Sequence, residues 1–309
     1  MQIVHGHAAA PTWARAAIAI GNFDGVHVGH RALIARARAL AAARDALTCV
    51  LTFDPHPTAL LAPARAPAMV STLARRLELF ADAGVDAVIV EPFTHALAGA
   101  SPEAFLDDVV IAGLRACAIV VGYDFSYGQG RTGNVDALRA HGAAAGVDVA
   151  IVPAVEIDGE IAASTQIRAR LRAGDLAGAR RMLGRPWDVD GVVVHGAERG
   201  RALGYPTANI APELALPVAP GIYVVTLAVD GGPPLPAVAS LGTNPTFVDG
   251  GDVVLEVHVL DWRGDLYDRR VRTTFLARLR DEQRFDSVEA LVVQIERDLA
   301  AARAQFAGA

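Results

Sequence analysis

The densest group of residues that could do chemistry lies near the amino terminus, in the stretch GNFDGVHVGH at residues 21–30. An apolar run of strand length precedes it and an amphipathic pattern follows it, so we expect it to join a strand to a helix. Backbone amides and the helix dipole favour an anion at such a junction. Glycines let a phosphate approach the backbone, and His27 and His30 supply ring N–H donors. The stretch therefore predicts a phosphate-binding loop.

Two other interpretations of this histidine pair stay open. An HxxH pair can bind zinc, although no cysteine or acidic residue nearby completes a tetrahedral set. His27 and His30 could also be packing residues without a chemical role. Their position between a strand and a helix favours phosphate over both. Asp24 could either contact a ligand or bond the local backbone of a turn.

A second group occupies residues 194–210, VHGAERGRALGYPTANI. Its three glycines and two arginines within about a dozen residues predict a flexible loop around phosphates, although a surface loop with a hairpin turn would have a similar composition. Thr207 and Asn209 are two residues apart, so in an extended segment their side chains point to the same side. Their oxygens would suit a Mg²⁺ ion that a nucleoside triphosphate already holds.

A carboxylate stands in a third pattern, the alternating run VVLEVHV at residues 253–259. Strict alternation places Glu256 and His258 on one face of a strand and the valines and leucine on the other. A carboxylate on such a face could act as a general base. It could equally belong to the solvated side of an ordinary strand.

The elements that must position these residues follow two patterns, of which the first covers residues 1–185. Short apolar runs alternate there with helical patterns, which predicts a parallel sheet covered on both faces. The ligand site of such a sheet lies beyond the carboxyl ends of its strands. A serine, a proline and an acid at residues 101–103 mark one helix start. We expect strands at 16–21, 47–53, 86–91, 117–122 and 148–152, and helices near 30–44, 71–83, 101–113 and 133–145.

Residues 186–309 follow the second pattern, in which glycine and proline clusters separate short apolar runs without helices between them. This predicts a small antiparallel barrel as a second domain. A final amphipathic helix is expected to begin at Asp286 as its N-cap, with Glu289 three residues later. The expected strands are 189–195, 222–229, 237–241, 253–260 and 269–276.

Composition excludes several classes of function. The 309 residues include 28 basic residues, all arginine, so there is no Schiff-base, pyridoxal-phosphate or P-loop lysine. The net charge is −6, and residues 1–185 hold 17 arginines against 17 acidic residues, so nucleic-acid binding is not expected. Cys49 and Cys117 lie far apart in apolar runs, which is typical of reduced core cysteines. Without a membrane-length apolar run or a signal peptide, the expected location is the cytoplasm.

The stretch at residues 21–30 closely resembles the nucleotide-binding signature of the HxGH nucleotidyltransferases, in the form found in bacterial FAD synthetases. Three further stretches resemble the motifs of that family, in family order. They are TFDPHP at 52–57, GYDFSYG at 122–128 followed by Arg131 and Gly133, and ASTQIR at 163–168. The family usually has serine where this chain has Ala163, which puts one hydroxyl contact in question.

This resemblance implies a Rossmann-like fold and an adenylyl transfer from ATP to FMN, with pyrophosphate released. It implies that His27 and His30 are catalytic and hold the phosphates of ATP. It places the FMN side at Asp54, His56, Asp124 and Phe125. The residues implied to bind ATP are Gly21, Phe23, Asp24, Gly29, His30, Ser164, Thr165 and Arg168.

The stretch GRALGYPTANI at residues 200–210 closely resembles the signature of riboflavin kinase, a small Greek-key barrel. Four later blocks follow in family order, at 220–223, 241–247, 255–258 and 280–285. The resemblance implies that Glu256 is the catalytic base and that Thr207 and Asn209 hold Mg²⁺. The residues implied to bind ATP are Gly200, Arg201, Gly204, Thr207 and Asn209, and those implied to bind the flavin are Arg280, Asp281 and Phe285.

Together the two resemblances imply a bifunctional riboflavin kinase and FAD synthetase that acts on riboflavin, FMN and ATP with Mg²⁺. Two alternatives stay open. The first module could transfer a nucleotide to another phosphorylated acceptor. The chain could also be a flavin-responsive regulatory protein, for which Ala163 is the motivation, although His27, His30 and Arg168 are retained. The sequence predicts no particular oligomeric state.

Overall fold

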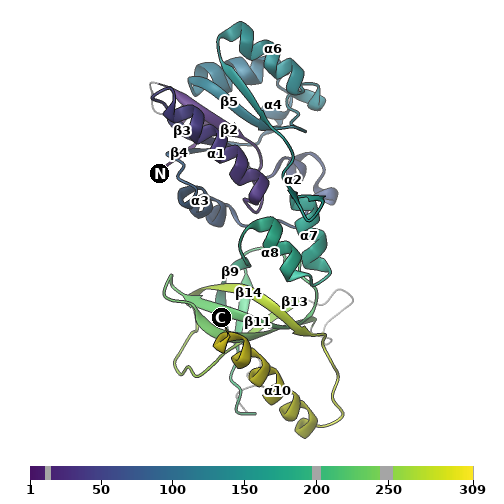
Figure 1. Ribbon diagram of the computed structural model, residues 1–309. Coiled ribbons are helices and arrows are strands. Elements are labelled where there is room, and N and C mark those ends of the chain that lie inside the picture. Colours follow the sequence, from purple (N-terminus) through teal and green to yellow (C-terminus); the bar gives the residue numbers. More distant parts are fainter. Residues whose placement is uncertain (11–14, 197–202, 244–252, 309) are drawn as a thin grey trace. The chain divides into compact units, whose positions relative to one another are not determined.

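The computed structural model describes residues 1–10, 15–196, 203–243 and 253–308 (Figure 1). The chain forms two compact units, of which the first contains Met1–Pro67 and Leu73–Ala163. The second contains Ala68–Thr72 and Ser164–Ala309.

The first unit is built on a six-stranded parallel sheet in the order β1-β4-β3-β2-β5-β6. All five predicted strands are present with bounds within one residue of the prediction. The edge strand β1 was missed because only one of its four residues, Val4, is buried, which leaves no apolar pattern. The strands are β1 (Gln2–His5), β2 (Ala16–Ile20), β3 (Leu47–Asp54), β4 (Ala87–Pro92), β5 (Ala116–Gly122) and β6 (Asp148–Val152).

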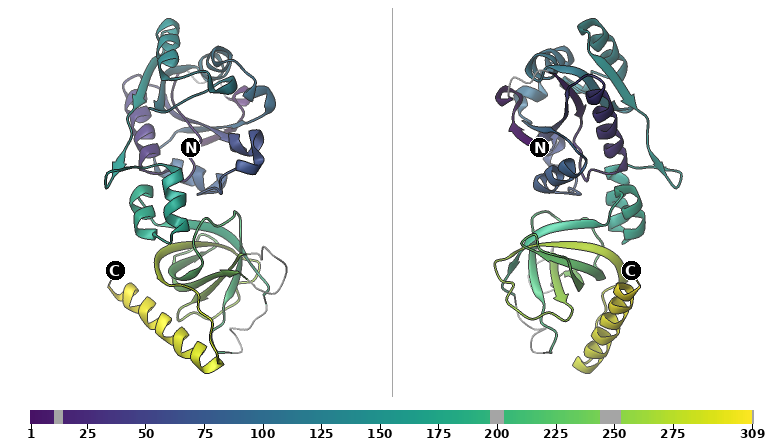
Figure 2. Two further views of the ribbon diagram at one scale, coloured as in Figure 1. Left: turned by 90° about the vertical axis from the view of Figure 1, so that its right-hand side faces the viewer. Right: turned by 60° about the vertical axis from the view of Figure 1, so that its left-hand side comes forward.

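Helices pack on both faces of this sheet, as predicted (Figures 1 and 2). Successive strand residues face opposite sides, so Ile18 enters one hydrophobic core and Ala17 and Ala19 enter the other. The predicted apolar stripe of α1 is buried in the second core. The main helices are α1 (Val28–Ala42), α3 (Leu73–Asp82), α5 (Pro102–Ala104) and α6 (Val135–Ala145).

The predicted helix at 101–113 is present but is not a uniform α-helix. Ser101 caps it as expected, its Oγ accepting from Ala104 N at 3.1 Å, with Pro102 in the first turn. After α5 the backbone continues as a π-helix, η3 (Phe105–Gly113). The smaller elements of this unit are η1 (His7–Ala9), α2 (Pro57–Leu61), η2 (Pro63–Arg65), α4 (His95–Ala98), η4 (Gln129–Arg131), β7 (Glu156–Ile157) and β8 (Glu160–Ile161).

The second unit is a closed antiparallel barrel in the order β10-β13-β12-β11-β14-β9, as expected for a small barrel (Figure 2). The sequence predicted five of its strands, and the sixth, β10, was described only as an extended segment. β10 pairs with β13 instead of the next strand along the chain, a Greek-key type of connection. The strands are β9 (Trp187–Val194), β10 (Ala208–Pro212), β11 (Gly221–Val229), β12 (Leu235–Thr243), β13 (Val253–Val259) and β14 (Arg270–Arg280).

In the described part of this unit, three helices accompany the barrel: α7 (Ser164–Arg172), α8 (Leu176–Leu183) and α10 (Val288–Ala307). The amide of Ala219 donates to the carbonyl of Leu171 at 3.1 Å, which attaches α7 to the start of β11. The compact units therefore divide before α7, whereas we predicted functional domains at 1–185 and 186–309. That functional boundary stays a prediction.

The start predicted for the final helix was wrong by one residue. Ser287 is the N-cap of α10, and its Oγ accepts from Ala290 N at 3.2 Å, whereas Asp286 lies one residue outside. Both side chains can cap a helix, so their sequence alone did not decide between them. Further along α10, the buried Asp298 makes an ion pair with the partly buried Arg280 of β14, with Nη2 and Oδ2 2.7 Å apart.

Candidate active sites

The strand order gathers three of the predicted motifs at one edge of the parallel sheet. β2 lies between β3 and β5, and GNFDGVHVGH, TFDPHP and GYDFSYG follow or include the carboxyl ends of these three strands. Helix connections reverse direction at β2, which makes this edge the topological switch point where open α/β sheets bind ligands. The expectation that one site collects these motifs is consistent with this order.

His27 has a structural role as the N-cap of α1. Its Nδ1 accepts from Gly29 N at 3.2 Å, so the neutral ring carries its proton on Nε2. A side chain at Gly29 would bring its Cβ within 3.1 Å of the His27 ring, a tight contact that favours glycine here. His27 is therefore held in one tautomer that can donate from Nε2.

His30 stacks on His27 with ring centroids 3.6 Å apart, and it also lies against Phe23. Burial, then His27, then Arg76 lower its pKa well below the usual value, so His30 is neutral at pH 7. Its Nδ1 is buried and has no hydrogen-bond partner among the residues that the structure describes. The ring can therefore act through hydrogen bonds but not as a cation.

The loop before His27 has an unusual backbone. Phe23, Gly25 and Val26 have φ values of 53°, 80° and 41°, and Phe23 and Val26 are fully buried beneath the loop. Left-handed conformations at non-glycine residues cost roughly 1–3 kcal/mol each, so they persist where surrounding contacts fix them. Asp24, between them, is only 3% exposed. Gly21 lies against the Phe23 ring.

The second and third motifs bring polar groups to the same edge. Asp54 ends β3, and its peptide bond to Pro55 is cis. His56 caps α2, with Nδ1 accepting from Thr58 N at 3.2 Å. After β5, Asp124 is exposed and its Oδ1 lies against Gly122. Each predicted FMN-side residue thus stands at the carboxyl end of a strand or just beyond it.

The sequence reasoning missed an aromatic cluster at this edge. It contains Phe53, Phe93, Phe105, Phe125 and Tyr127. Phe105 is 6.4 Å from Phe53 and 6.0 Å from Tyr127, and Phe125 stacks on Tyr127 at 5.4 Å. Of the five, only Phe125 was predicted to face the flavin. The five rings come from four segments far apart in the sequence, so no local pattern indicated the cluster.

A buried arginine was also missed. Arg76 of α3 is 2% exposed, and its guanidinium lies beside Asn22 and Thr52. A signal was present, because Arg76 precedes Leu79 and Phe80 by three and four residues and so shares their inward stripe.

The fourth motif lies at the start of α7, in the second unit. The helix begins at Ser164, so Ser164 and Thr165 stand in its first turn, as expected for groups that meet an anion. Arg168 is 8% exposed. Because α7 belongs to the second unit and His27 and His30 to the first, the predicted contact of these residues with the ATP at His27 and His30 stays a prediction.

The barrel brings three predicted kinase residues together. Thr207 Oγ1 donates to Glu256 Oε2 at 3.3 Å, and Asn209 lies directly opposite Glu256 in the β10–β13 ladder. Directly paired residues share a face, so the three side chains gather on one side of the barrel. Gly196 lies against the Asn209 amide, where a Cβ would come within 2.2 Å of Nδ2. The predicted alternation is confirmed for residues 255–259, since Leu255, Val257 and Val259 are buried and Glu256 and His258 are not. Val254 was expected on the opposite face, but it lies two residues from Glu256 and shares its partly exposed face.

The other residues predicted to bind ATP or flavin at the kinase site lie outside this group of three. Gly200 and Arg201 lie outside the described residues. Gly204 has a φ of 86° in a turn before Thr207, which suits glycine. Arg280, predicted to contact flavin, is held by Asp298 and donates from Nη1 to the Asp281 carbonyl at 2.9 Å, while its guanidinium lies 5.9 Å from the Phe285 ring.

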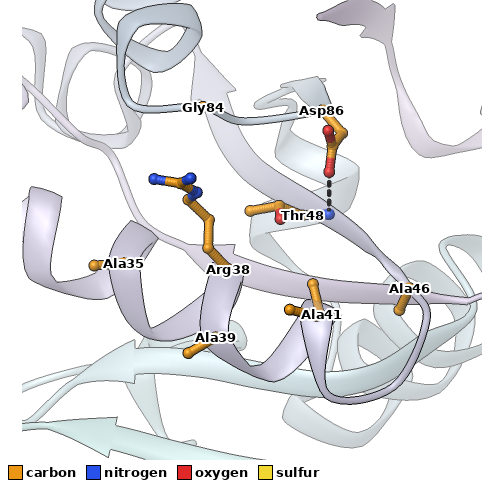
Figure 3. A pocket seen from close by; sticks show the side chains of 9 residues that line it. Ala35, Arg38, Ala39, Ala41, Ala46, Thr48, Gly84 and Asp86 are labelled. Atoms are coloured by element: carbon orange, nitrogen blue, oxygen red, sulfur yellow. Dashed lines mark hydrogen bonds between the residues drawn. The ribbon is translucent and has the colours of Figure 1, made fainter.

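Neither site coincides with the open pocket in Figure 3. That pocket of about 510 Å³ is lined mainly by alanines of α1, with Arg38, Thr48 and Asp86 among its polar groups. Asp86 accepts from Thr48 N at 2.8 Å. Thr48 and Asp86 stand at the amino-terminal ends of β3 and β4, away from the carboxyl edge that carries the motifs.

Comparisons with known proteins cover both units. The family model for FAD synthetase matches residues 9–166, and the model for riboflavin kinase matches residues 183–306. A bifunctional riboflavin kinase/FMN adenylyltransferase of Pseudomonas fluorescens is 42% identical over 98% of this chain and 97% of its own length. The Escherichia coli K12 protein of the same name is 38% identical over 94% of this chain and 92% of its own length.

One solved structure also matches almost the whole chain. It is described as a macrolide-efflux protein from Streptococcus pneumoniae, with a TM-score of 0.87, 30% identity, and coverage of 98% of this chain and 99% of the other. Among the described residues of this chain, no helix is long and apolar enough to cross a membrane.

A glycine-rich loop with two stacked histidines at the switch point of a parallel sheet, followed by a barrel with a carboxylate beside hydroxyl and amide oxygens, is the arrangement expected of a two-module class of nucleotide-dependent transferases. The sequence comparisons narrow this class. The chain belongs to the family of bifunctional riboflavin kinase/FMN adenylyltransferases.

Proposed function

We propose that this chain phosphorylates riboflavin to FMN at the barrel and adenylates FMN to FAD at the parallel sheet, using one ATP in each step. The observation that carries the kinase assignment is the gathering of Thr207, Asn209 and Glu256 on one face. The adenylyltransferase assignment is carried by the stacked rings of His27 and His30 at the switch point, where His27 also caps α1.

In the kinase step, Glu256 is the general base. Its carboxylate takes the proton of the riboflavin 5′-hydroxyl as that oxygen attacks the γ-phosphorus of ATP, and ADP leaves. The Thr207 hydroxyl, which donates to Glu256 at 3.3 Å, orients the carboxylate before the substrate arrives. Arg280, Asp281 and Phe285 flank the flavin, with Asp298 holding Arg280 in place.

The oxygen donors of this face fit Mg²⁺. Thr207 and Asn209 offer hard oxygens beside a carboxylate, which is the donor type that Mg²⁺ prefers when it arrives with a nucleotide. Among the described residues, no group of three or more histidine, cysteine or acidic side chains is arranged to hold a metal by itself. We propose that Thr207 and Asn209 hold the ion, which would neutralise charge on the ATP phosphates.

In the adenylyl transfer, the FMN phosphate attacks the α-phosphorus of ATP, and pyrophosphate leaves. A phosphate is already a nucleophile at pH 7, so positioning and charge stabilisation account for catalysis. His27 donates from Nε2 and His30 from its neutral ring to the ATP phosphates. Ser164, Thr165 and Arg168 complete the proposed phosphate contacts, and Gly21, Phe23, Asp24 and Gly29 shape the loop.

The FMN side of this site is proposed at Asp54, His56, Asp124 and Phe125. The aromatic cluster supports it, because the half-buried rings of Phe53, Phe93 and Phe125 offer flat apolar surface to an isoalloxazine at the same edge. We further propose a cytoplasmic location, which the two free cysteines support, since a reducing compartment keeps thiols free.

The decisive experiment is chromatography of the products formed from riboflavin, ATP and Mg²⁺. Formation of FMN followed by FAD, with one pyrophosphate released per FAD, is the expected result. FMN without FAD would remove the adenylyltransferase assignment. A second incubation, with ATP and other phosphorylated acceptors in place of FMN, tests whether the acceptor is FMN. If neither FMN nor FAD forms, the result would support a flavin-binding regulatory protein.

A further inference from the structure

Arg76 carries a charge into the interior of the first unit. Its side chain comes from α3, a helix outside all four motifs, and is 2% exposed. Burial lowers its pKa, while Asp24 and Asp54 oppose that shift. Burying an ionised group costs several kcal/mol unless partners compensate, so these partners define what Arg76 does.

The contacts of Arg76 join the first two motifs. Nη1 donates to the Asn22 carbonyl at 2.8 Å and lies 3.3 Å from Thr52 Oγ1, which itself donates to the same carbonyl at 3.2 Å. Nη2 lies 3.9 Å from Asp54 Oδ1, which is an electrostatic contact and not a hydrogen bond. One guanidinium thus ties the loop after β2 to the end of β3.

The Asn22 carbonyl that Arg76 binds lies at the start of the strained, left-handed part of the loop. Asn22 directly precedes Phe23, the first of the left-handed residues of the loop, and Gly25 and Val26 follow before His27. A strained conformation needs external contacts to fix it. The bond from Arg76 to Asn22 supplies one from outside the loop.

The charge of Arg76 also reaches the phosphate side of the loop. It contributes to lowering the pKa of His30, after burial and His27. Asp24, 3% exposed, interacts electrostatically with the same guanidinium. In a chain without lysine, Arg76 gives the base of the loop a fixed positive charge.

We propose that Arg76 is a positioning residue of the adenylyltransferase site: it fixes residues 21–25 against the end of β3 and so aligns the loop for the phosphates of ATP. The inference rests on the proposed function of the first unit. Arg76 itself is too buried to touch ATP, and it acts through the carbonyl of Asn22.

The test compares Arg76→Met and Arg76→Lys with the wild type. Arg139→Met is the matched control, because Arg139 of the same unit is exposed and pairs only with Asp136, at 3.4 Å, in the contacts described. For each full-length protein, pyrophosphate release is measured while ATP and FMN are varied separately. A thermal melt that matches the wild type shows whether the first unit, which carries Arg76, is folded, and riboflavin phosphorylation in the same preparation reports on the second unit.

We expect Arg76→Met to lower kcat/KM for adenylyl transfer about 100-fold, since a misplacement of about 1 Å can cost that much. KM for ATP should rise at least about tenfold, KM for FMN should change less than about twofold, and Arg76→Lys should recover part of the loss because it keeps the charge. The control and all kinase rates should match the wild type.

A purely structural role predicts a different pattern. Unchanged KM for ATP in a folded Arg76→Met protein, or equal increases in both KM values, would overturn the proposal. If Arg76→Met loses kinase activity as well, Arg76→Lys decides by the same two KM values. If the wild type makes no FAD, the proposed function is refuted. That result differs from the KM patterns that would refute the role of Arg76.

Discussion

Replacing Glu256 with glutamine should stop FMN formation and leave FAD formation from supplied FMN intact. The substitution keeps the size and shape of the side chain and lets it retain its contact with Thr207, which is long at 3.3 Å. It removes only the capacity to accept the proton of the 5′-hydroxyl. General-base catalysis contributes roughly 10²- to 10⁴-fold, or about 2.7–5.4 kcal/mol of transition-state stabilisation.

The structure also limits what else this substitution can change. Glu256 is half-buried on the polar face of β13, and its apolar neighbours Leu255 and Val257 face the other way. We therefore expect a loss of folding free energy below about 1 kcal/mol, which is typical of a substitution that leaves no cavity.

The assay is chromatographic separation of FMN and FAD in two parallel reactions, one started from riboflavin and the other from FMN. The riboflavin reaction should slow by at least about 100-fold with KM values near those of the wild type, and the FMN reaction should not change. Asn209→Ala serves as a contrast, since losing a ligand of MgATP should raise KM for ATP. A Glu256→Gln protein that phosphorylates riboflavin within tenfold of the wild-type rate would refute the assignment of the base.

Three further predictions concern His30 and the C-terminal helix. His30→Ala should abolish FAD formation from supplied FMN, measured as pyrophosphate release, with kinase activity unchanged; normal FAD output would remove its role at the phosphates. Because the pKa of folded His30 lies below the unfolded value of about 6.5, its protonation favours unfolding, so stability is retained above pH 6.5 and falls below it. Melting curves from pH 8 to 5 should show a shallower decline for His30→Asn, and parallel curves would contradict this. Asp298→Ala leaves the mostly buried Arg280 without its carboxylate partner and should cost about 3 kcal/mol in urea unfolding, against less than about 1 kcal/mol for Arg303→Ala at the exposed pair with Asp261.

The local hydrophobic pattern of the sequence was sufficient to predict most of the strands and helices. The central strands β2, β3, β4 and β5 are mostly apolar runs because both faces of the sheet are buried there, and the edge strand β6 is a short apolar run that is only partly buried. The bounds of all five were predicted to within a residue. β1 buries only Val4, and β10 follows Pro206 closely and ends at Pro212, so neither has a run long enough to indicate a strand.

The arrangement of those elements depends on contacts between distant residues, which no local pattern contains. That β2 lies between β3 and β5 follows from long-range pairing. The aromatic cluster and the hydrogen bond from Arg76 to the Asn22 carbonyl are consequences of that strand order. The chemistry of His27 was predicted, but its use of Nδ1 to cap α1, which selects the tautomer, required coordinates.

The closure of the barrel bears on how the protein avoids self-association. Within the described strands, each of the six barrel strands is hydrogen-bonded to a neighbour on either side, so the barrel offers other chains no free edge to pair with. The parallel sheet does end, at β1 and β6. β1 is four residues long and three of them are exposed, a length too short to template a stable intermolecular pairing. Ring closure thus leaves the described barrel strands without a free edge, and a short strand limits intermolecular pairing at the β1 edge of the parallel sheet.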